Sequence, residues 1–357
     1  MGIQSGNKGE WSELYVLGFL LANGGAYAAD GLQNPKLDSF YKVLEIFLES
    51  QSLEDYRQYQ IGEKTVEILS SDGHISSVDR EGIRDILEDF LSGILAGGDT
   101  STFELESGQA LMEKLHRDRL AASSSNVNDL ELRFLDSETG TPSPRLGFSV
   151  KSQMGSAPTL LNASGSTNAT FRLEVPHGVS DEELLELNQL TAKPKFQKLS
   201  EKNVSLSFVR FDSKIFESNL SLIDSQMPSY LARLISEYYF SDKSSLADIA
   251  EAVFPAGYSN SFQPTFKVKQ FVGSIAMGMR PASYWDGDVT KFKGLILAKL
   301  DGDVLLYNLY NLREFEEFLF KNLKFETASQ SRHKFLEIYR GDDDGLRIKL
   351  NLQLRFV

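Results

Sequence analysis

The 357-residue chain contains no cysteine, which excludes disulfide bonds, thiolate zinc sites and cysteine nucleophiles. No apolar run approaches the ~18 residues that a membrane-spanning helix needs. The first nine residues contain one lysine and lack an apolar core, so we expect no signal peptide, no membrane partner and a cytoplasmic protein. Phosphate-binding and dinucleotide-binding glycine loops are also absent, as are the HExxH and GxSxG motifs. Several large enzyme classes are thereby excluded.

Basic residues are scarce in the first part of the chain. Residues 1–140 contain 11 Lys and Arg against 25 Asp and Glu, whereas residues 141–357 contain 26 and 25. The total net charge of −13 argues against a nucleic-acid partner. However, a local patch rather than the total charge decides contact with a phosphate backbone. The balanced charge of residues 141–357 therefore does not exclude a nucleic-acid partner.

Hydrophobic periodicity divides the chain into expected elements. Helical spacing and end signals predict helices over residues 10–22, 36–50, 79–95, 181–190, 226–240, 244–253 and 312–323. Alternation predicts a strand–loop–strand unit around residues 130–150, a strand over 203–211, a hairpin over 295–310 and a final strand over 347–356.

Acidic residues near the N-terminus and a lysine in mid-chain suit a metal site. Glu10 and Glu13 stand three residues apart and share one face of the first expected helix. Asp136 ends the first strand of the strand–loop–strand unit and can reach the face of the next strand that carries Lys151. Carboxylates suit Mg²⁺, and a lysine can bind a scissile phosphate and orient or deprotonate the attacking water. These residues indicate metal-assisted phosphodiester cleavage, although an ordinary strand-end acid and an exposed strand lysine fit the same spacing.

The mid-chain strand resembles part of a known nuclease motif. Asp136, a gap of 12 residues and Ser149-Val150-Lys151 resemble the PD-(D/E)XK motif, with serine in the acidic position. A serine there occurs in some restriction endonucleases whose missing carboxylate comes from a helix. Lys8-Gly9 followed by Glu13 resembles that helix motif. The resemblance therefore makes Glu13 the replacement ligand and Glu10 the reserve.

Three islands extend the resemblance over nearly the whole chain. Residues 7–15, 147–164 and 324–333, in this order, are similar to HpaII-type type II restriction endonucleases. The resemblance implies an α/β PD-(D/E)XK core, with a central mixed sheet flanked by helices. It also implies Mg²⁺-dependent double-strand cleavage of DNA at a short palindrome, CCGG. A cytosine DNA methyltransferase of the same specificity would protect the host.

We expect four regions on this basis. They are an N-terminal core helix in residues 1–30, an acidic helical insertion at the periphery in 31–125, a nuclease core with the catalytic hairpin in 126–215, and a C-terminal α/β DNA-recognition region in 216–357.

The resemblance also implies roles for the motif residues. Glu13 and Asp136 would hold Mg²⁺ with help from the Val150 carbonyl, and Lys151 would position the phosphate and the attacking water. Glu10 is either the alternative ligand or an acid that stabilises the first helical turn through the helix dipole. The catalytic candidates are therefore Asp136, Lys151, Glu13, Ser149 and Gln153, and the metal candidates are Glu13, Asp136, Val150 and Glu10.

The expected DNA contacts lie in several segments of the chain. In the third island Arg332 can bind guanine O6 and N7 in one bidentate contact, and Gln330 can accept a hydrogen bond from cytosine. A charged loop without a role in recognition fits the same residues. The full set of candidates is Lys8, Ser152, Asn162, Ser164, Asn168, Lys267, Lys269, Arg280, Gln330, Ser331, Arg332, His333 and Lys334.

Two other functions remain open from the sequence. A structure-specific nuclease, such as a junction resolvase, would cut branched DNA regardless of its sequence. A DNA-binding module without cleavage is the other, because position 149 lacks an acid. A palindromic target would suit either a homodimer with matched half-sites or a monomer that cuts the strands in turn.

Overall fold

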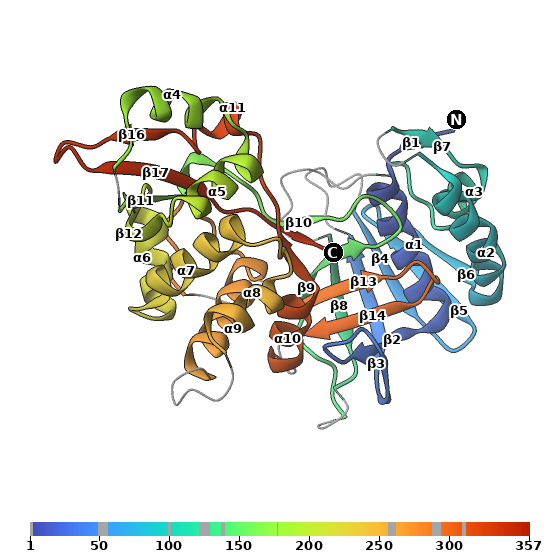
Figure 1. Cartoon of the computed structure of the whole chain (residues 1–357). Helices are drawn as coiled ribbons and strands as arrows, with labels where there is room; N and C mark the ends of the chain where they lie inside the picture. Colours follow the sequence, from blue (N-terminus) through green and yellow to red (C-terminus); the bar gives the residue numbers. More distant parts are fainter. Residues whose placement is uncertain are drawn as a thin grey trace. The chain divides into compact units, whose positions relative to one another are not determined.

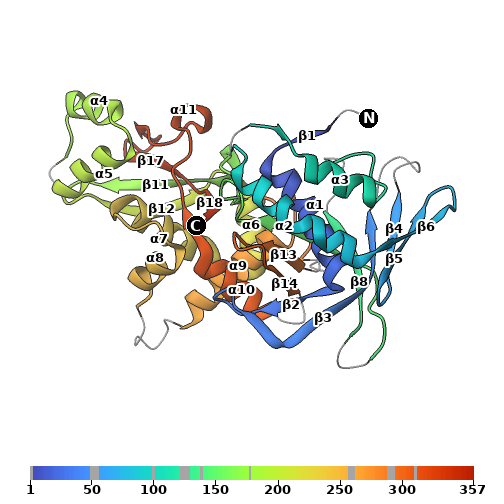
Figure 2. The ribbon, with the colours of Figure 1, turned by 90° about the vertical axis from the view of Figure 1, so that its right-hand side faces the viewer.

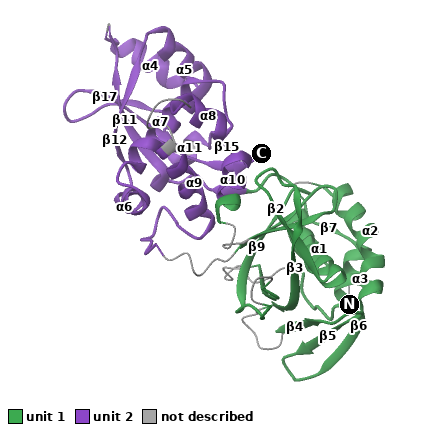
Figure 3. Ribbon diagram, turned by 90° about the horizontal axis from the view of Figure 1, so that it is seen from below, with its two compact units in different colours: residues 1–158, 290–315 green, residues 159–289, 316–357 purple. Residues whose placement is uncertain are grey.

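The structure is a computed structural model that describes residues 3–48, 56–98, 101–120, 129–136, 140–176, 178–255, 262–287, 294–308 and 312–357. Contacts divide the chain into two compact units (Figure 3). Unit 1 comprises residues 1–158 and 290–315, and unit 2 comprises residues 159–289 and 316–357. Each unit is therefore assembled from two separate stretches of the sequence. None of the described helices is long and apolar enough to cross a membrane.

Unit 1 is built on a nine-stranded mixed sheet in the order β2-β14-β13-β9-β8-β3-β4-β5-β6 (Figure 1). The first half of the long strand β3 pairs with β2 and its second half with β8 and β4, so the strands from β2 to β3 close into a ring. β13 runs parallel to β9, and β14 runs parallel to β2. The strands are β2 (Gly25–Ala29), β3 (Pro35–Leu48), β4 (Arg57–Ile61), β5 (Thr65–Ser70), β6 (Ile75–Asp79), β8 (Leu130–Phe134), β9 (Leu146–Ser152), β13 (Gly294–Ala298) and β14 (Val304–Asn308). A separate pair joins β1 (Ser5–Gly6) to β7 (Phe103–Glu104).

Three helices pack together over this sheet, α1 (Lys8–Asn23), α2 (Arg80–Ala96) and α3 (Glu106–Lys114) (Figure 2). Helix α1 is buried on most of its surface, and Trp11 contacts Phe90 of α2 edge to face in the core. The helix begins at Asn7, whose side chain accepts a hydrogen bond from the Glu10 backbone while the Glu10 carboxylate accepts one from the Asn7 backbone. It ends at Gly24, whose φ of 72° suits a residue without a Cβ atom. These caps fix both ends of the helix that carries Glu13.

Unit 2 contains a four-stranded sheet in the order β12-β11-β17-β16 and a three-stranded sheet in the order β10-β18-β15. Its strands are β10 (Thr159–Leu161), β11 (Asn168–Glu174), β12 (Ser205–Phe211), β15 (Leu323–Phe325), β16 (Ile338–Arg340), β17 (Leu346–Asn351) and β18 (Leu354–Phe356). Its helices are α4 (Asp181–Gln189), α5 (Ala192–Glu201), α6 (Lys214–Ile223), α7 (Met227–Phe240), α8 (Leu246–Val253), α9 (Phe262–Ala276), α11 (Gln330–His333) and most of α10 (Leu312–Asn322), with the 3-10 turn η2 (Gly165–Thr167).

Most expected elements are confirmed, including the helices α1, α2, α4, α7, α8 and α10 and the hairpins β8–β9 and β13–β14. Residues 309 and 310, at the end of the expected hairpin over 295–310, lie outside the described part of the chain. The expected strand over 347–356 is split into β17 and β18, which join different sheets.

The helix expected over residues 36–50 is wrong, because residues 35–48 form β3. This strand joins the two halves of the nine-stranded sheet, and residues 57–79 add β4, β5 and β6 to it. The acidic segment 31–125 is therefore not a peripheral helical insertion but an integral part of unit 1. The run Phe40-Tyr41-Lys42-Val43-Leu44 contains apolar residues at helical spacing, but the long-range pairing with β2 and β8 decides its structure.

Candidate active site

The N-terminal turns of α1 lie against the end of β9. The Ser152 hydroxyl donates a hydrogen bond of 2.8 Å to the Ser12 hydroxyl, which donates one of 2.6 Å to the Lys8 carbonyl. A Cβ atom added at Gly155 would lie 3.0 Å from the Lys8 Cβ atom, so the chain after β9 also approaches the helix closely. The helix thus brings residues of the first island to residues of the second.

A pocket of about 260 Å³ opens where these two elements meet. Glu13 and Lys151 both line it, so the helix carboxylate and the strand lysine lie in one pocket of unit 1, and their roles there stay predictions. The lining residues are Asn7, Lys8, Gly9, Glu13, Val150, Lys151, Ser152, Gly155, Ser156 and Pro158.

A second carboxylate, Asp129, lies beside β9. The Val150 backbone amide donates to its Oδ2 atom at 2.6 Å, and the Ser149 hydroxyl donates to the same oxygen at 3.1 Å. The Asp129 amide donates to the Phe148 carbonyl at 3.0 Å. Asp129 directly precedes β8, which pairs antiparallel with β9, so it stands next to the last residues of β9. The serine in the acidic position of the motif thus helps to hold an acid from the neighbouring strand.

The electrostatic influence of its neighbours places Glu13 in the same cluster. Burial, and then the nearby Asp129 carboxylate, raise the pKa of Glu13 from 4.5 to about 7. The cations Arg117 and Lys151 oppose this rise. A bound cation next to these groups would relieve the unfavourable ionisation of Glu13.

The structure does not bring Asp136 to this cluster, and in this respect the expected site is wrong. Leu130 pairs with Phe148 and Leu132 with Leu146, so Asp136 lies toward the connecting turn while Lys151 lies at the open end of the hairpin. At about 3.4 Å per residue the two are roughly 30 Å apart. The Asp136 amide donates to the Thr141 carbonyl in the turn.

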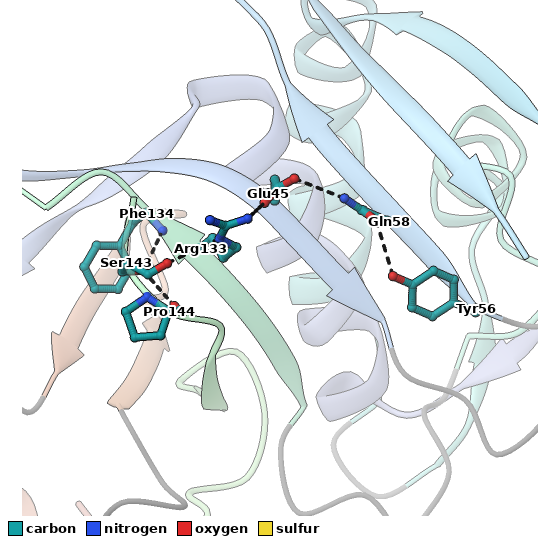
Figure 4. A network of polar contacts seen from close by, with 7 residues as sticks. All are labelled: Glu45, Tyr56, Gln58, Arg133, Phe134, Ser143 and Pro144. Carbon is teal, nitrogen blue, oxygen red and sulfur yellow. Dashed lines mark hydrogen bonds and ion pairs between the residues drawn. The ribbon is translucent and has the colours of Figure 1, made fainter. Parts of the chain in front are cut away.

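Near the turn of the β8–β9 hairpin, side-chain contacts hold neighbouring strands together (Figure 4). The Ser143 hydroxyl accepts from the Phe134 amide at 3.1 Å, and Arg133 forms an ion pair of 2.8 Å with Glu45 of β3. Gln58 of β4 donates to Glu45 at 3.1 Å. These contacts join β8, β3 and β4 and leave the acid–lysine cluster at the other end of β9.

Three further candidates for the site have structural partners. The Glu10 carboxylate closes the capping box of α1, as the helix-end interpretation anticipated. The Gln153 side chain donates to the Gln33 side chain at 2.7 Å and is not among the residues that line the pocket. Lys8 is 8% exposed as a residue, and its ammonium donates to the Leu95 carbonyl at 3.3 Å.

Comparisons with known proteins identify the family of the chain. A family model described as HpaII restriction endonuclease matches residues 7–356. The type II restriction enzyme HpaII of Haemophilus parainfluenzae is 36% identical over 360 residues, which are 99% of this chain and 99% of that protein. The chain belongs to the HpaII restriction endonuclease family. As a member of this family it is a site-specific endonuclease, a phosphodiester hydrolase. No solved structure matches the chain.

The polar residues that follow the pocket in the sequence belong to unit 2. Those expected to contact DNA differ in how far they are exposed. Asn162 is exposed, whereas Asn168 is 4% exposed and donates to the His333 carbonyl at 3.1 Å. The Ser164 carbonyl accepts from buried Asn351 at 2.9 Å. Asn168 and Ser164 thus form hydrogen bonds with other residues of unit 2.

The basic candidates on and after α9 are partly neutralised. Lys267 lies 3.6 Å from Asp224, and Lys269 forms an ion pair with Glu317. Arg280 is exposed. A role in DNA contact stays a prediction for all three.

The third island forms the short helix α11, whose cations face outward. Arg332 and Lys334 are exposed and His333 is partly exposed, while Phe335 and Leu336 directly after them are buried. Gln330 is partly buried, and the side chain of Ser331 lies outside the described ones. These residues thus form a basic turn on a buried base, and their role in base recognition stays a prediction.

Proposed function

We propose that the chain is a Mg²⁺-dependent type II restriction endonuclease whose catalytic residues are Glu13, Asp129 and Lys151. The observation that carries the proposal is the cluster of these residues at the meeting point of α1, β8 and β9. Asp129, Ser149 and Lys151 then correspond to the PD-(D/E)XK pattern with serine in the acidic position. Glu13 supplies the second carboxylate from the helix, and Asp129 replaces Asp136 in the expected set.

The donor atoms of this cluster fit Mg²⁺, which prefers oxygen ligands and keeps several of its waters. Glu13 and Asp129 are the carboxylate ligands. The Val150 N–H faces Asp129, and the N–H and C=O of a strand residue point to the same side. The Val150 carbonyl would therefore add an oxygen ligand to the two carboxylates. The Oδ1 atom of Asp129 accepts no hydrogen bond from the described part of the chain. When bound there, Mg²⁺ supplies a Lewis acid for the phosphate and favours the ionised form of both acids.

The protein residues act around that ion. Lys151 lines the same pocket and binds the scissile phosphate, where its positive charge stabilises the charge that develops during cleavage and orients the attacking water. Ser149 and the Val150 amide position Asp129. The pocket walls from α1 and the turn after β9 limit the directions from which a phosphodiester can approach Lys151.

The palindrome CCGG is the target that we propose for this enzyme. The family resemblance and the 36% identity to HpaII over nearly the whole chain support it. Arg332 is the proposed guanine reader, because it is exposed and can donate to O6 and N7 together. A cytosine methyltransferase of the same specificity would be the functional partner, and both a homodimer and a monomer remain compatible with a palindrome.

Incubation of unmethylated plasmid with the protein, in Mg²⁺ and in EDTA, followed by mapping of the ends, tests the proposal. We expect discrete fragments that end at CCGG in Mg²⁺ alone. Lys151→Ala should abolish cleavage and largely spare DNA binding.

Failure to cut in any divalent ion, together with retained binding at CCGG, would make the protein a binding module. Cutting of branched DNA regardless of sequence would indicate a structure-specific nuclease instead.

A further inference from the structure

The four-stranded sheet of unit 2 has one apolar face and one polar face. Phe171 and Phe208 meet edge to face on adjacent strands, and Phe211 contacts Phe216 of α6 in the same way. Helices α6 and α7 contact β12 on this side, and α6 and α7 also contact α9. One face of the sheet is therefore used for the core of unit 2.

The opposite face carries cations from three adjacent strands. The register places Arg210, Thr170 and Lys349 in one row across β12, β11 and β17. Arg172 and Arg347 pair in the next row along. Neighbouring strands are about 4.8 Å apart and every second residue is about 7 Å further along, so these side chains form a compact group. We call Arg172, Arg210, Arg347 and Lys349 the cationic sheet face.

Acidic side chains hold parts of this face in place. Asp212 forms an ion pair of 2.7 Å with Lys349, and Asp343 approaches both Arg347 at 2.9 Å and Arg172 at 3.6 Å. Such partly exposed pairs contribute little free energy, so a phosphate can compete for the cations at small cost.

Two arginines of the face are available to a partner. The Arg172 side chain is 51% exposed, and Arg210 is exposed. Arg210 has no ion pair with any residue that the structure describes. A purely structural role in the sheet would leave Arg210 without a reason for its position.

The basic turn at α11 lies at one end of the same face. Asn168 belongs to the row of β11 side chains on this side, and its amide donates to the His333 carbonyl. Asn351, its partner on β17, donates to Asn168 at 2.6 Å. The buried amides therefore anchor the turn that exposes Arg332 and Lys334 to the sheet that carries the cationic face.

We propose that the cationic sheet face, continued by Lys334 of the basic turn, binds the phosphate backbone of duplex DNA. The inference rests on the proposed function and adds to it a surface outside the pocket of unit 1. Charge complementarity selects this partner, because two exposed arginines, Arg172 and Arg210, lie on the same sheet face of a chain whose net charge is −13. Phosphate contacts of this kind set the orientation of the protein on the duplex and carry no sequence information themselves.

The test is equilibrium binding of the full-length protein to a labelled duplex without CCGG, in EDTA, over a range of salt concentrations. The variants are Arg172→Ala with Arg210→Ala, and separately Lys349→Ala. Lys198→Ala is the matched control, since Lys198 is an exposed cation on α5, which packs against α7. For each phosphate that a variant no longer neutralises, we expect the slope of log K against log salt to fall by about 0.9 and the affinity at about 0.1 M salt to fall roughly eightfold.

The control should keep the wild-type slope and affinity. Unchanged binding in the face variants, or equal losses in Lys198→Ala, would overturn the proposal. A loss of affinity with an unchanged salt slope and a lower melting temperature would also overturn it, because the face would then be structural. Plasmid cleavage by the wild type, run in parallel, separates the two claims. Normal cleavage with unchanged variant binding leaves the proposed function in place, whereas a wild type that neither binds nor cuts DNA ends both.

Discussion

The Asp129 carboxylate is held by the strand that carries Lys151. One of its oxygens accepts two hydrogen bonds, from the Val150 amide and the Ser149 hydroxyl, which keep the acid in place. Asp136 is also an aspartate and lies on the same hairpin, but at the other end of it. Position on the hairpin rather than residue type therefore separates the proposed ligand from a turn residue.

Asp129→Asn and Asp136→Asn form a matched pair for the proposed site. Asp129→Asn removes a proposed metal ligand and should lower kcat by about 10²-fold or more, while Asp136→Asn should leave it within a few-fold of wild type. Cleavage of plasmid under single-turnover conditions measures both. Equal losses, or a larger loss for Asp136→Asn, would contradict the assignment.

Glu13 makes the stability of the metal-free protein depend on pH. Its pKa is about 7 in the folded state and 4.5 as a free group, so between these values the folded protein holds a proton that the unfolded chain has released. The free energy of unfolding that this group contributes is therefore present below pH 4.5 and falls as pH rises toward 7. Glu13→Gln should remove this loss and stabilise the metal-free protein at about pH 8 by roughly 1–3 kcal/mol.

Urea unfolding in EDTA at acid and alkaline pH measures this difference. The stabilisation by Glu13→Gln should shrink as pH falls, and Asp136→Asn serves as the control at the other end of the hairpin. A stabilisation that grows toward acid pH would refute the assignment of the pKa.

At the scale of elements, the site depends on the start of α1. Glu13 stands in the second turn, and the capping box of Asn7 and Glu10 fixes where the helix begins. Ser152 and Ser12 then join the helix to β9 across the floor of the site. A shift of the helix start would move Glu13 relative to Asp129 and Lys151.

Asn7→Ala and Ser180→Ala test this dependence, because Ser180 begins α4 of unit 2 with an equivalent capping box. Both variants should lose about 1 kcal/mol of stability in denaturant unfolding. Asn7→Ala should also lower cleavage, since it loosens the turn before Glu13, whereas Ser180→Ala should cut at the wild-type rate. Similar cleavage by the two variants would show that the cap does not position the site.

At the scale of the whole molecule, unit 1 is completed by a late stretch of the sequence. β13 pairs with β9 on one side and with β14 on the other, and β14 pairs with β2. All five residues of β13 are buried. The catalytic strand β9 therefore has one neighbour from its own hairpin and one from more than a hundred residues further along the chain.

Residues 1–158 alone should not fold. Without residues 290–315 the fragment exposes one edge of β9 and one of β2 together with the apolar surface that β13 and β14 cover. Near-UV circular dichroism and the cooperativity of urea unfolding would show this, and a linked copy of residues 290–315 should restore both. A cooperative transition in the short fragment would mean that the late strands are not required.

The sequence alone determined most elements, the hairpin and the family islands, because these depend on local spacing and on neighbouring residues. It predicted Glu13 and Lys151 in one site, and both line the same pocket. Only the tertiary structure decided which acid of the hairpin lies beside Lys151, and that residues 35–48 form a strand. An acid just before the first strand was the available signal for Asp129, since antiparallel pairing puts that position beside the end of the second strand. β3 gave no such signal, because its apolar residues fit a helix until β2 and β8 supply the backbone partners that make it a strand.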